Sequence, residues 1–420
     1  MTRTPEPPSP LDRTMRAFPV RHPDARLRIG ALLHLTGAAP DIGVLRGRIA
    51  DRLPALPVLT HYLAGSGTRW ETEHRFEPAA HVVDHPLPPG PAHLDRAVQR
   101  LLRDPLPEGA PHWRVWLLRG HVPGGYAVLY LVHHAVQDGA GMLHTLETLF
   151  TADGVPEDRS SAVFHGFAGA PRLTLPDRVR ALATASRTAR RTAVWNSSRH
   201  PLSSLRTFRW AEVPTRSLRA VARTRSGTVN DAYLATLAHA LQGWAGSYWP
   251  LVHRSAHLEL TMPANVRRPG EAGAPGNRSV MVRLALPGGD VPLERRLEGA
   301  VRATAPLRSG RSREALRRAT ASSYAPQWLL RGITRLCATP AHATVGVSGL
   351  VLRHGLELDG DPVTRVAPVG CLPGGSPLGV LALAYRGTST ACFIADRAVP
   401  GLDTLHQRWR RTVLTGGDGV

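Results

Sequence analysis

The sequence predicts an α/β protein made of two mixed lobes, on the basis of its length, its composition and its pattern of segments. The 420 residues are more than one ordinary core organises and fit two lobes of roughly 200 residues each. Apolar residues make up 42% of the chain, while the 37 Pro and 40 Gly are spread along it, as in a loop-rich globular protein. β-like and α-like segments alternate in both halves, without a repeat that would indicate a solenoid.

In the N-terminal half, the spacing of apolar residues predicts strands and helices in alternation. We expect strands at 27–35, 113–118 and 127–133, and helices at 42–53, at 92–103 and after Gly141. Residues 151–206 lack strand signals and include the Arg-rich stretch 178–191, which indicates a crossover helix with loops that joins the two halves. The expected domains are therefore an N-terminal lobe over residues 1–175, a linker over 176–206 and a C-terminal lobe over 207–420.

The C-terminal half repeats this mixture of segments. We expect strands at 207–213, 258–262, 280–286, 343–352, 378–385 and 389–395, and helices at 229–244, from about 293, and at 403–413. Arg386-Gly387 is expected to form the hairpin turn between the last two strands.

The basic composition bears on partners and location. The formal net charge is +20 and every basic side chain is Arg, which favours anionic partners such as CoA phosphates, anionic lipid or an acidic carrier protein. A codon bias towards G and C is the simplest explanation for the choice of Arg over Lys. Nucleic acid is not expected, because no known binding motif is present and aromatic residues are only 5%.

The cysteines and the apolar runs bear on the compartment. Cys337, Cys371 and Cys392 are far apart and predict neither a disulfide framework nor a zinc site. The N-terminus lacks the apolar core of a secretion signal, and no run is long enough to span a membrane. We therefore expect a cytoplasmic protein, with peripheral contact to a membrane surface left open.

The segment His133-His134-Ala135-Val136-Gln137-Asp138-Gly139 is the strongest candidate for chemistry. Six apolar residues, Ala127 to Val132, precede it and an amphipathic helix follows it, so it lies on a strand-to-helix connection. Apolar neighbours favour the neutral imidazole, which is the form that acts as a general base near neutral pH. Asp138 stands at the expected N-cap of the helix.

Two plainer explanations compete with the general base. Adjacent histidines in a chain with 20 His are often polar loop residues, and an Asp before a helix is often only a cap. Chance would produce the four fixed positions in only on the order of a few per thousand sequences, so coincidence is the weaker explanation. A metal site is also disfavoured, because adjacent side chains of an extended strand point to opposite faces.

This segment matches HHxxxDG, the signature of a superfamily that includes condensation domains, chloramphenicol acetyltransferase-like enzymes and the wax ester synthase/diacylglycerol acyltransferases. The sequence resembles the last group most closely. Shorter matches follow in the same order along the chain: Pro10-Leu11-Asp12, Ile29-Gly30-Ala31-Leu32-Leu33, Pro111-His112-Trp113, Thr228-Val229-Asn230-Asp231, Pro263-Ala264-Asn265-Val266-Arg267 and Gly276-Asn277. Each is weak alone, and their order and spacing make the resemblance specific.

The resemblance implies a fold and a set of roles. Two chloramphenicol acetyltransferase-like lobes, each a mixed sheet with helices, would have an active-site tunnel between them. His134 would be the base that takes a proton from the acceptor as it attacks an acyl thioester. His133 and Asp138 would hold the shape of the loop, Asp138 through an ion pair with an Arg that the sequence does not identify, and Gly139 would leave room for substrate. Acyl-CoA or a phosphopantetheinyl thioester would be the co-substrate, with no metal and no permanently bound cofactor.

The sequence departs from the family in two places that affect the acceptor. His112 stands in the middle of a motif that is usually Pro-Leu-Trp in wax ester synthases. The late Ser-Asn-Val-Pro-Gly element appears only as Val345-Gly346-Val347-Ser348-Gly349. Acceptor selectivity therefore stays open.

Residues outside the signature are candidates for substrate binding. Asn230 belongs to a Thr228–Asp231 capping box, which helix capping alone explains. Asn265, Arg267 and Asn277 flank strands in a Pro- and Gly-rich stretch, where they either line the substrate path or close turns, and Ser348 comes from the late element. The candidates for CoA phosphates are Arg267, Arg268, Arg308, Arg311 and Arg313, although exposed Arg more often forms a solvated face.

The leading hypothesis is an acyltransferase that moves an acyl group from CoA or a carrier-protein thioester to an alcohol or amine acceptor, with His134 as base. One alternative is a free-standing condensation enzyme that forms an amide from carrier-bound substrates in specialised metabolism. Another is a catalytically silent lipid- or carrier-binding module. The intact His134, Asp138 and Gly139 disfavour the silent module.

Overall fold

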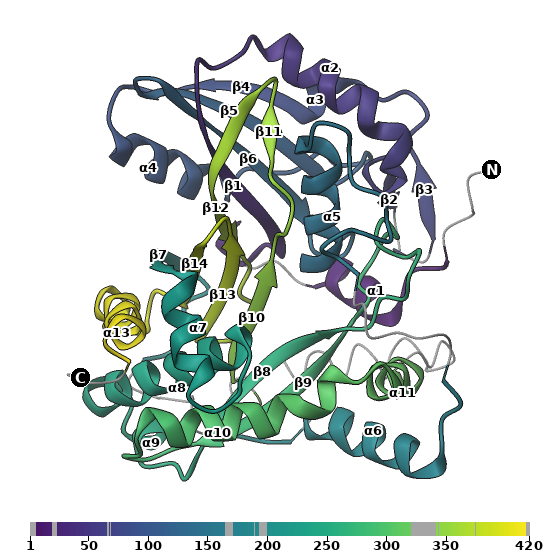
Figure 1. The fold of residues 1–420 in the computed structure, drawn as a ribbon. Helices are drawn as coiled ribbons and strands as arrows, with labels where there is room; N and C mark the ends of the chain where they lie inside the picture. The colour runs from purple at the N-terminus through teal and green to yellow at the C-terminus, as the bar shows by residue number, and fades with distance from the viewer. Residues whose placement is uncertain are drawn as a thin grey trace. The chain divides into compact units, whose positions relative to one another are not determined.

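The computed structural model describes residues 6–18, 23–64, 67, 69–163, 171–188, 190–192, 200–320, 342, 344–373 and 375–416. These residues belong to two compact units. Unit 1 comprises residues 1–164, 267–278 and 351–371, and unit 2 comprises residues 165–266, 279–350 and 372–420. Each unit contains a six-stranded sheet with helices, which confirms the predicted α/β class (Figure 1). Across the described ranges, no helix is both long and apolar enough to cross a membrane.

The sheet of unit 1 has the strand order β11-β12-β1-β6-β5-β4. Its strands are β1 (Arg28–Thr36), β4 (Val82–Pro86), β5 (Trp113–Val122), β6 (Gly125–His133), β11 (Glu357–Leu358) and β12 (Asp361–Val369). All neighbours with a printed register are antiparallel except β4 and β5, which are parallel. Residues 126–132 of the central strand β6 are all buried, as expected for an apolar run covered on both faces.

The helices of unit 1 are short to medium in length and include the helix that follows the signature segment. They are α1 (Pro10–Arg16), α2 (Ile42–Arg52), α3 (Pro78–His81), α4 (Pro91–Leu101) and α5 (Gly139–Phe150). The unit also contains a two-stranded sheet and three 3-10 turns: β2 (His61–Leu63), β3 (Trp70–Thr72), η1 (Pro23–Ala25), η2 (Leu53–Ala55) and η3 (Pro57–Leu59).

The sheet of unit 2 has the strand order β7-β14-β13-β10-β8-β9. Its strands are β7 (Arg206–Pro214), β8 (His257–Asn265), β9 (Ser279–Pro287), β10 (Val345–Val351), β13 (Leu378–Tyr385) and β14 (Thr388–Asp396). The turn between β13 and β14 has Arg386 and Gly387 at φ values of 44° and 83°, which confirms the predicted hairpin.

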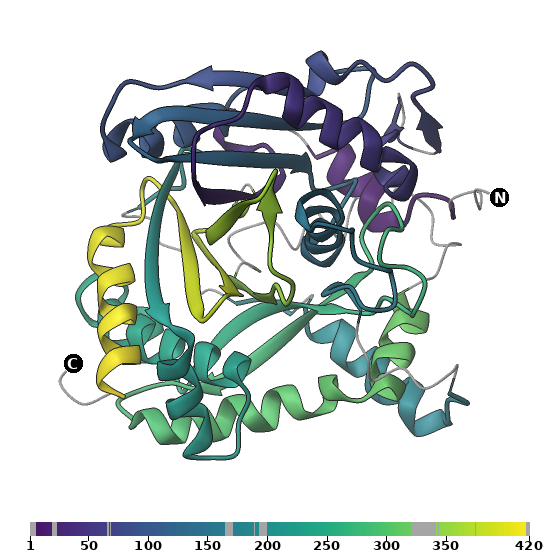
Figure 2. The same cartoon turned by 45° about the horizontal axis from the view of Figure 1, so that its top comes forward.

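The core of unit 2 forms where its helices cover the sheet. The helices are α6 (Leu175–Arg187), α7 (Thr215–Arg223), α8 (Val229–Tyr248), α9 (Pro250–His253), α10 (Leu293–Thr304), η4 (Ala305–Arg308), α11 (Gly310–Thr320) and α13 (Leu402–Thr415). The long helix α8 starts with the predicted capping box of Thr228 and Asp231. It is buried against α10 and against α13, which Figure 2 shows in yellow beside β7.

The division of the chain differs from the expected contiguous lobes in one respect. Residues 267–278 and 351–371 lie in the predicted C-terminal lobe, but they pack with the N-terminal residues. Strand β12 causes part of this difference, since it pairs antiparallel with β1 from Gly30 opposite Val369 to Leu35 opposite Val363. A division at a single boundary overlooks such a pairing, because the two strands are more than 300 residues apart in sequence.

Candidate active site

The signature segment connects the end of β6 to the start of α5, as the sequence predicts. The backbone amide of His133 donates to the carbonyl of His112 at 2.9 Å, and that of His134 donates to the carbonyl of Leu27 at 2.8 Å. The carbonyl of His134 accepts a bond from Asn277 Nδ2 at 2.7 Å. The backbone of His134 is therefore fixed on both sides of its side chain.

The imidazole of His134 is half-buried and has no bonding partner in the described parts of the chain. Its Nδ1 is fully shielded from solvent and forms no hydrogen bond there. The main chain of His134 is thus held in place, while its ring nitrogens remain available for hydrogen bonding.

The hydrogen bond and the burial of His133 indicate a structural role. Its Nδ1 accepts a bond from the Ala135 amide at 3.1 Å, which requires that this nitrogen carry no proton. Burial lowers the pKa of His133 to about 3, and the positive charges of Arg16 and Arg28 add to the effect. The ring is therefore neutral at physiological pH and shapes the turn through Ala135.

Asp138 caps α5 and pairs with a buried arginine. Its Oδ1 accepts from the Gly141 amide at 2.9 Å and from Arg267 Nη1 at 2.5 Å, while its Oδ2 accepts from the Arg278 amide at 2.8 Å. Burial raises the pKa of this carboxyl, but the Arg267 guanidinium and the two amides outweigh burial, so the net pKa is lowered. Asp138 therefore remains a carboxylate.

Arg267 is the partner that the sequence alone does not identify. Its side chain has no exposed surface, and its other bonds go to the carbonyls of Glu271 and Gly276 at 3.2 and 3.3 Å. A guanidinium enclosed in this way is not placed to meet CoA phosphates, in contrast to the exposed position considered from the sequence. Its contacts are those of a positioning residue for Asp138.

Residues 276 and 277 hold the other side of the segment. The Gly276 amide donates to the carbonyl of Val136 at 2.6 Å. Asn277 donates to Asp12 Oδ1 through its amide at 2.7 Å and through Nδ2 at 2.8 Å. Gly276 has a φ of 84°, and a Cβ there would lie 2.6 Å from Asp12 Oδ2, so this position requires glycine. The matched Asp12, Gly276 and Asn277 therefore meet around the signature.

Gln137 is a supporting residue that sequence reasoning missed. It accepts from the Tyr130 hydroxyl at 2.7 Å and donates to Thr145 Oγ1 at 2.7 Å, which joins β6 to α5 behind the segment. Gln137 occupies one of the variable positions of HHxxxDG, so the motif does not indicate a role for it. Only its burial in the structure indicates that it supports the segment.

Comparison with known proteins identifies a family that this sequence resembles. Residues 22–193 match the family model of the wax ester synthase/diacylglycerol acyltransferase catalytic domain. This part of the chain is similar to the catalytic domain of that family. The family resemblance expected from the sequence is thereby confirmed.

Curated relatives of this acyltransferase-like chain come from mycobacteria. A Mycobacterium tuberculosis (strain H37Rv) protein named as the diacylglycerol O-acyltransferase Rv3371 is 30% identical over 235 residues, covering 53% of this chain and 52% of the relative. A Mycobacterium bovis protein, Mb0919, named in the same way, is 28% identical over 337 residues, covering 69% and 66%. The chain thus spans about half the length of the first of these curated relatives.

Solved structures share the fold at low identity. The wax ester synthase/diacylglycerol acyltransferase from Marinobacter aquaeolei VT8 has a TM-score of 0.64 and 18% identity, covering 97% of this chain and 98% of that one. The starter condensation domain of rhizomide synthetase RzmA, solved in complex with C8-CoA, has a TM-score of 0.65 and 16% identity, covering 98% and 94%. At these identities the likeness concerns the fold.

The other predicted substrate-binding residues of this acyltransferase-like chain lie in unit 2. Asn230 contacts the late element, because a Cβ built on Gly349 would lie 2.4 Å from Asn230 Oδ1. Ser348 precedes this glycine on β10 and is half-buried. Asn265 ends β8, and its carbonyl accepts a bond from Arg313 at 2.5 Å. Asn230 and the late element are therefore neighbours within their unit.

Three arginines considered for CoA phosphates contact the protein itself. Arg308 pairs with Asp231, Arg311 lies 3.7 Å from Asp177, and Arg313 donates to the Leu307 carbonyl at 2.6 Å. They lie on η4 and α11. These contacts indicate structural roles for three of the arginines that the sequence offers as candidates for CoA phosphates.

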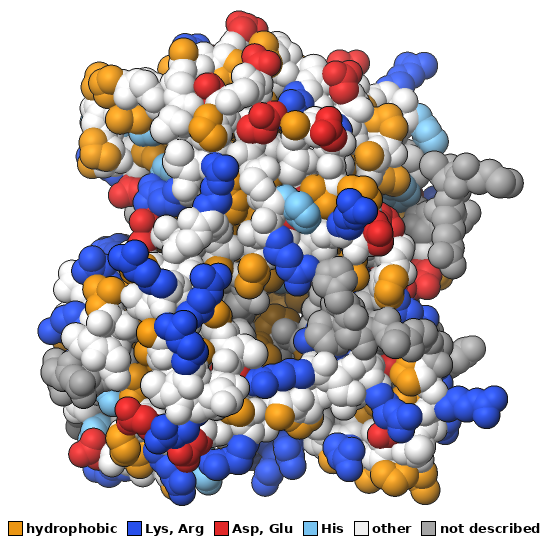
Figure 3. Space-filling model, viewed as in Figure 1, with side chains coloured by type: hydrophobic (Ala, Val, Ile, Leu, Met, Phe, Trp, Pro, Cys, Tyr) orange, Lys and Arg blue, Asp and Glu red, His pale blue; other side chains and the backbone are white. Residues whose placement is uncertain are grey.

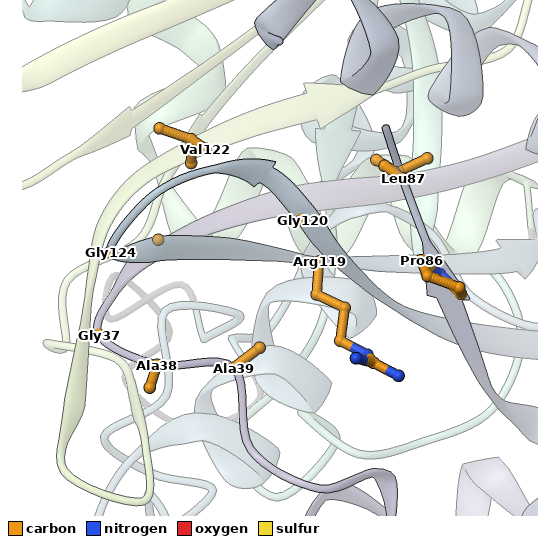
Figure 4. A pocket seen from close by; sticks show the side chains of 10 residues that line it. Gly37, Ala38, Ala39, Pro86, Leu87, Arg119, Gly120, Val122 and Gly124 are labelled. Atoms are coloured by element: carbon orange, nitrogen blue, oxygen red, sulfur yellow. The ribbon is translucent and has the colours of Figure 1, made fainter. Parts of the chain in front are cut away.

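A cavity of about 290 Å³ lies elsewhere in unit 1 (Figure 4). It is lined by the residues around the β5–β6 turn, including Gly120, Val122 and Gly124. The turn is at the opposite end of β6 from His133, roughly 26 Å away for eight residues of strand. Its one charged side chain, Arg119, already pairs with Asp84 at 2.5 Å. The cavity is therefore separate from the signature segment.

Proposed function

We propose that this protein is an acyltransferase that moves an acyl group from a CoA or carrier-protein thioester to an alcohol or amine acceptor. The arrangement of His134 carries the proposal, since its backbone is anchored to Leu27 and Asn277 while its ring nitrogens have no bonding partner in the described chain. The names of the mycobacterial relatives support acyl transfer to oxygen. The CoA complex of the RzmA domain supports a thioester donor.

In the proposed reaction, His134 acts as general base. The acceptor oxygen or nitrogen attacks the thioester carbonyl carbon while an imidazole nitrogen takes the acceptor proton. The tetrahedral intermediate then collapses, the C–S bond breaks and the proton passes from His134 to the leaving sulfur. The products are an ester or amide and a free thiol.

The remaining predicted residues have supporting roles in this proposal. Asp138, Arg267 and His133 hold the shape of the loop, and Asn277 holds the His134 carbonyl. Gly139 gives the substrate access beside the first turn of α5. Asn230, Asn265 and Ser348 of unit 2 remain candidates for substrate contacts.

Replacement of His134 tests the mechanism. With acyl-CoA donors and mixed alcohol and amine acceptors, His134→Ala should lower the rate of thiol release by about 10²- to 10⁴-fold, the usual contribution of a general base. The matched control is His74→Ala at an exposed position, which should keep the wild-type rate. Circular dichroism and a thermal melt establish that each variant is folded. Full activity of a folded His134→Ala variant would contradict the proposal.

The same assay separates the alternatives. An identical acyl group is presented on CoA and on a carrier protein, and product mass distinguishes ester from amide. A rate that is higher with the carrier donor, together with an amide product, would identify the condensation enzyme. Absence of transfer and of hydrolysis with every donor would identify a silent binding module.

A further inference from the structure

Arg278 connects the signature loop to the N-terminal segment of unit 1. Its backbone amide donates to Asp138 Oδ2 at 2.8 Å, and the preceding residue, Asn277, bonds the carbonyl of His134 at 2.7 Å. The side chain of Arg278 donates to a different partner, with Nη1 2.7 Å from Glu6 Oε2. Arg278 therefore brings a positive charge close to the loop that holds His134.

The guanidinium of Arg278 is incompletely bonded. Within the described ranges, the bond to Glu6 is the only one that this side chain forms, and its Nε–H has no acceptor. Arg267, by contrast, has no exposed surface and bonds to three protein oxygens. A guanidinium has several N–H donors in a planar fork, so Arg278 has donors left for another acceptor.

Glu6 is a partner that another anion can replace. It lies outside any helix or strand, and its side chain is 58% exposed. An ion pair with an exposed partner contributes little free energy. The main chain of Glu6 is held separately, since its carbonyl accepts a bond from Trp70 Nε1 at 3.1 Å. The carboxylate can therefore leave Arg278 while the backbone of residue 6 stays in place.

Positive charge alone does not locate an anion site on this protein. The net charge is +20, and Figure 3 shows basic side chains scattered over the visible face. Three arginines of η4 and α11 contact the protein itself, and Arg267 is enclosed. Arg278 differs from these four, because it combines a place beside the signature loop with an exposed anionic partner.

The length of a thioester donor fits this position. In CoA and in the prosthetic group of a carrier protein, a pantetheine arm joins the reacting sulfur to a phosphate and extends to roughly 16 Å, at about 1.2 Å per bond. Even with every link extended, the path from His134 through Asn277 to the Arg278 guanidinium is about as long as this arm. One arm therefore reaches from a sulfur at His134 to a phosphate at Arg278.

We propose that Arg278 binds the phosphate of the pantetheine arm of the thioester donor, and that Glu6 holds the guanidinium in place until the donor binds. The guanidinium then pairs with the phosphate oxygens in bidentate fashion, and the Glu6 carboxylate turns to solvent. Because CoA and carrier-protein donors share this phosphate, the contact serves both. The inference rests on the proposed acyl transfer and adds a residue that recognises the donor.

Ligand binding tests the contact without any transfer. The protein is titrated calorimetrically with phosphopantetheine and with pantetheine, which differ only in the phosphate. The wild type should bind phosphopantetheine at least about tenfold more tightly, as a charge-assisted hydrogen bond predicts. Arg278→Gln should bind the two ligands equally, and Arg278→Lys should keep part of the preference. The matched control, Arg96→Gln, removes an exposed charge from α4 of the same unit and should bind like the wild type.

Replacement of Glu6 tests the exchange of partners. Glu6→Gln should bind phosphopantetheine about two- to fivefold more tightly, because the phosphate no longer competes with a carboxylate for Arg278. Its affinity for pantetheine should not change. The matched control, Asp95→Asn, removes an exposed negative charge from α4 and should leave both affinities unchanged. Weaker phosphopantetheine binding by Glu6→Gln would contradict the exchange.

Transfer assays distinguish a failure of this contact from a failure of the proposed activity. The same acyl group is presented on CoA, on a carrier protein and on pantetheine without phosphate. Arg278→Gln should raise KM about tenfold, and the rise should be confined to the two donors that carry the phosphate. Absence of transfer from every donor in the wild type would refute the activity, whereas the titrations test Arg278 without it.

Three results would overturn the assignment of Arg278. These are a wild type without preference for phosphopantetheine, an Arg278→Gln variant that keeps the wild-type preference, and a rise in KM with only one of the two phosphate-bearing donors. The last result would place Arg278 against the nucleotide of CoA or against the carrier protein, and not at the shared phosphate. Circular dichroism and thermal melts establish that each variant is folded.

Discussion

Arg267 shows how one side chain from a distant part of the sequence holds the signature loop in place. It lies 129 residues after Asp138, and the pair is enclosed by protein. Removing two charges from water is costly, and only close geometry with additional hydrogen bonds offsets the cost. The amides of Gly141 and Arg278 and the carbonyls of Glu271 and Gly276 supply those bonds.

A double-mutant cycle measures the coupling in this pair. Arg267→Met should lower the free energy of unfolding by about 3–5 kcal/mol, because it leaves a buried carboxylate without its counter-charge. Adding Asp138→Asn should recover part of that loss, giving a coupling energy of at least about 1 kcal/mol in urea denaturation.

The exposed pair of Arg209 and Asp403 provides the control cycle. Their side chains are 37% and 72% exposed at an N–O distance of 2.5 Å, so the same substitutions there should give a coupling of only about 0–1 kcal/mol. Equal coupling in the two cycles would refute a special role for the buried pair.

Only part of this site could be predicted at the residue level. The sequence identifies His134 through its motif and Asp138 through its place before a helix, because both signals are local. It does not identify Arg267 as the partner, since the chain has many arginines and none is marked by spacing. Gln137 was missed because its two bonds depend on how β6 and α5 lie together.

At the level of elements, the signature loop depends on how closely α5 approaches its neighbours. A Cβ added at Gly141 would lie 2.9 Å from Arg267 Nη2, so the first turn of α5 and the buried guanidinium leave no space for a methyl group. Gly47 in α2 is exposed, and a Cβ there would meet no atom within 4 Å. A larger residue is therefore excluded by packing at Gly141 but not at Gly47.

Alanine at these two glycines should have opposite effects on stability. Gly47→Ala should raise the free energy of unfolding by about 0.5–1 kcal/mol, because alanine lowers the entropy of the unfolded chain and favours helix. Gly141→Ala should lower it by about 1–3 kcal/mol, because Arg267 must move. Thermal and urea denaturation of both variants test this, and a stabilising Gly141→Ala would show that Arg267 yields without cost.

Most elements were predicted well, and β12 shows why some were not. The apolar runs of β1, β6, β13 and β14 carry their own signal, whereas β12 has the sequence Asp361-Pro-Val-Thr-Arg-Val-Ala-Pro-Val with two prolines. Proline argues against a central strand. It is tolerated here because β11 covers only the first residues of β12, which leaves the rest at the edge of the sheet.

At the scale of the whole molecule, the two units should respond differently to acid. Burial lowers the pKa of His34 and His133 to about 3 and of His144 to about 4, and all three lie in unit 1. These rings stay neutral in the folded state, whereas in the unfolded chain they take up protons below about pH 6.5. The free energy of unfolding is therefore unaffected by them above this pH and falls between about pH 6.5 and 4.

Pulse proteolysis in urea at pH 7 and pH 5 measures this response, with mass spectrometry to assign the cleaved unit. Unit 1 should become cleavable at lower urea at pH 5, while unit 2 changes less. His144→Leu should reduce the pH dependence by about one proton, and His74→Leu at an exposed position should not change it. A larger acid response in unit 2 would contradict the assignment.

Unit 1 is built from three separate stretches of the chain, so its parts become available at different times during synthesis on the ribosome. When residue 164 emerges, both histidines and Asp138 exist, but Arg267, Asn277 and strand β12 have not yet been made. Until these later residues have been translated, the Asp138 carboxylate lacks its Arg267 partner and the edge of β1 lacks its pairing with β12. The loop that holds His134 therefore gains all of its supporting contacts within unit 1 only in chains that have been translated as far as residue 371.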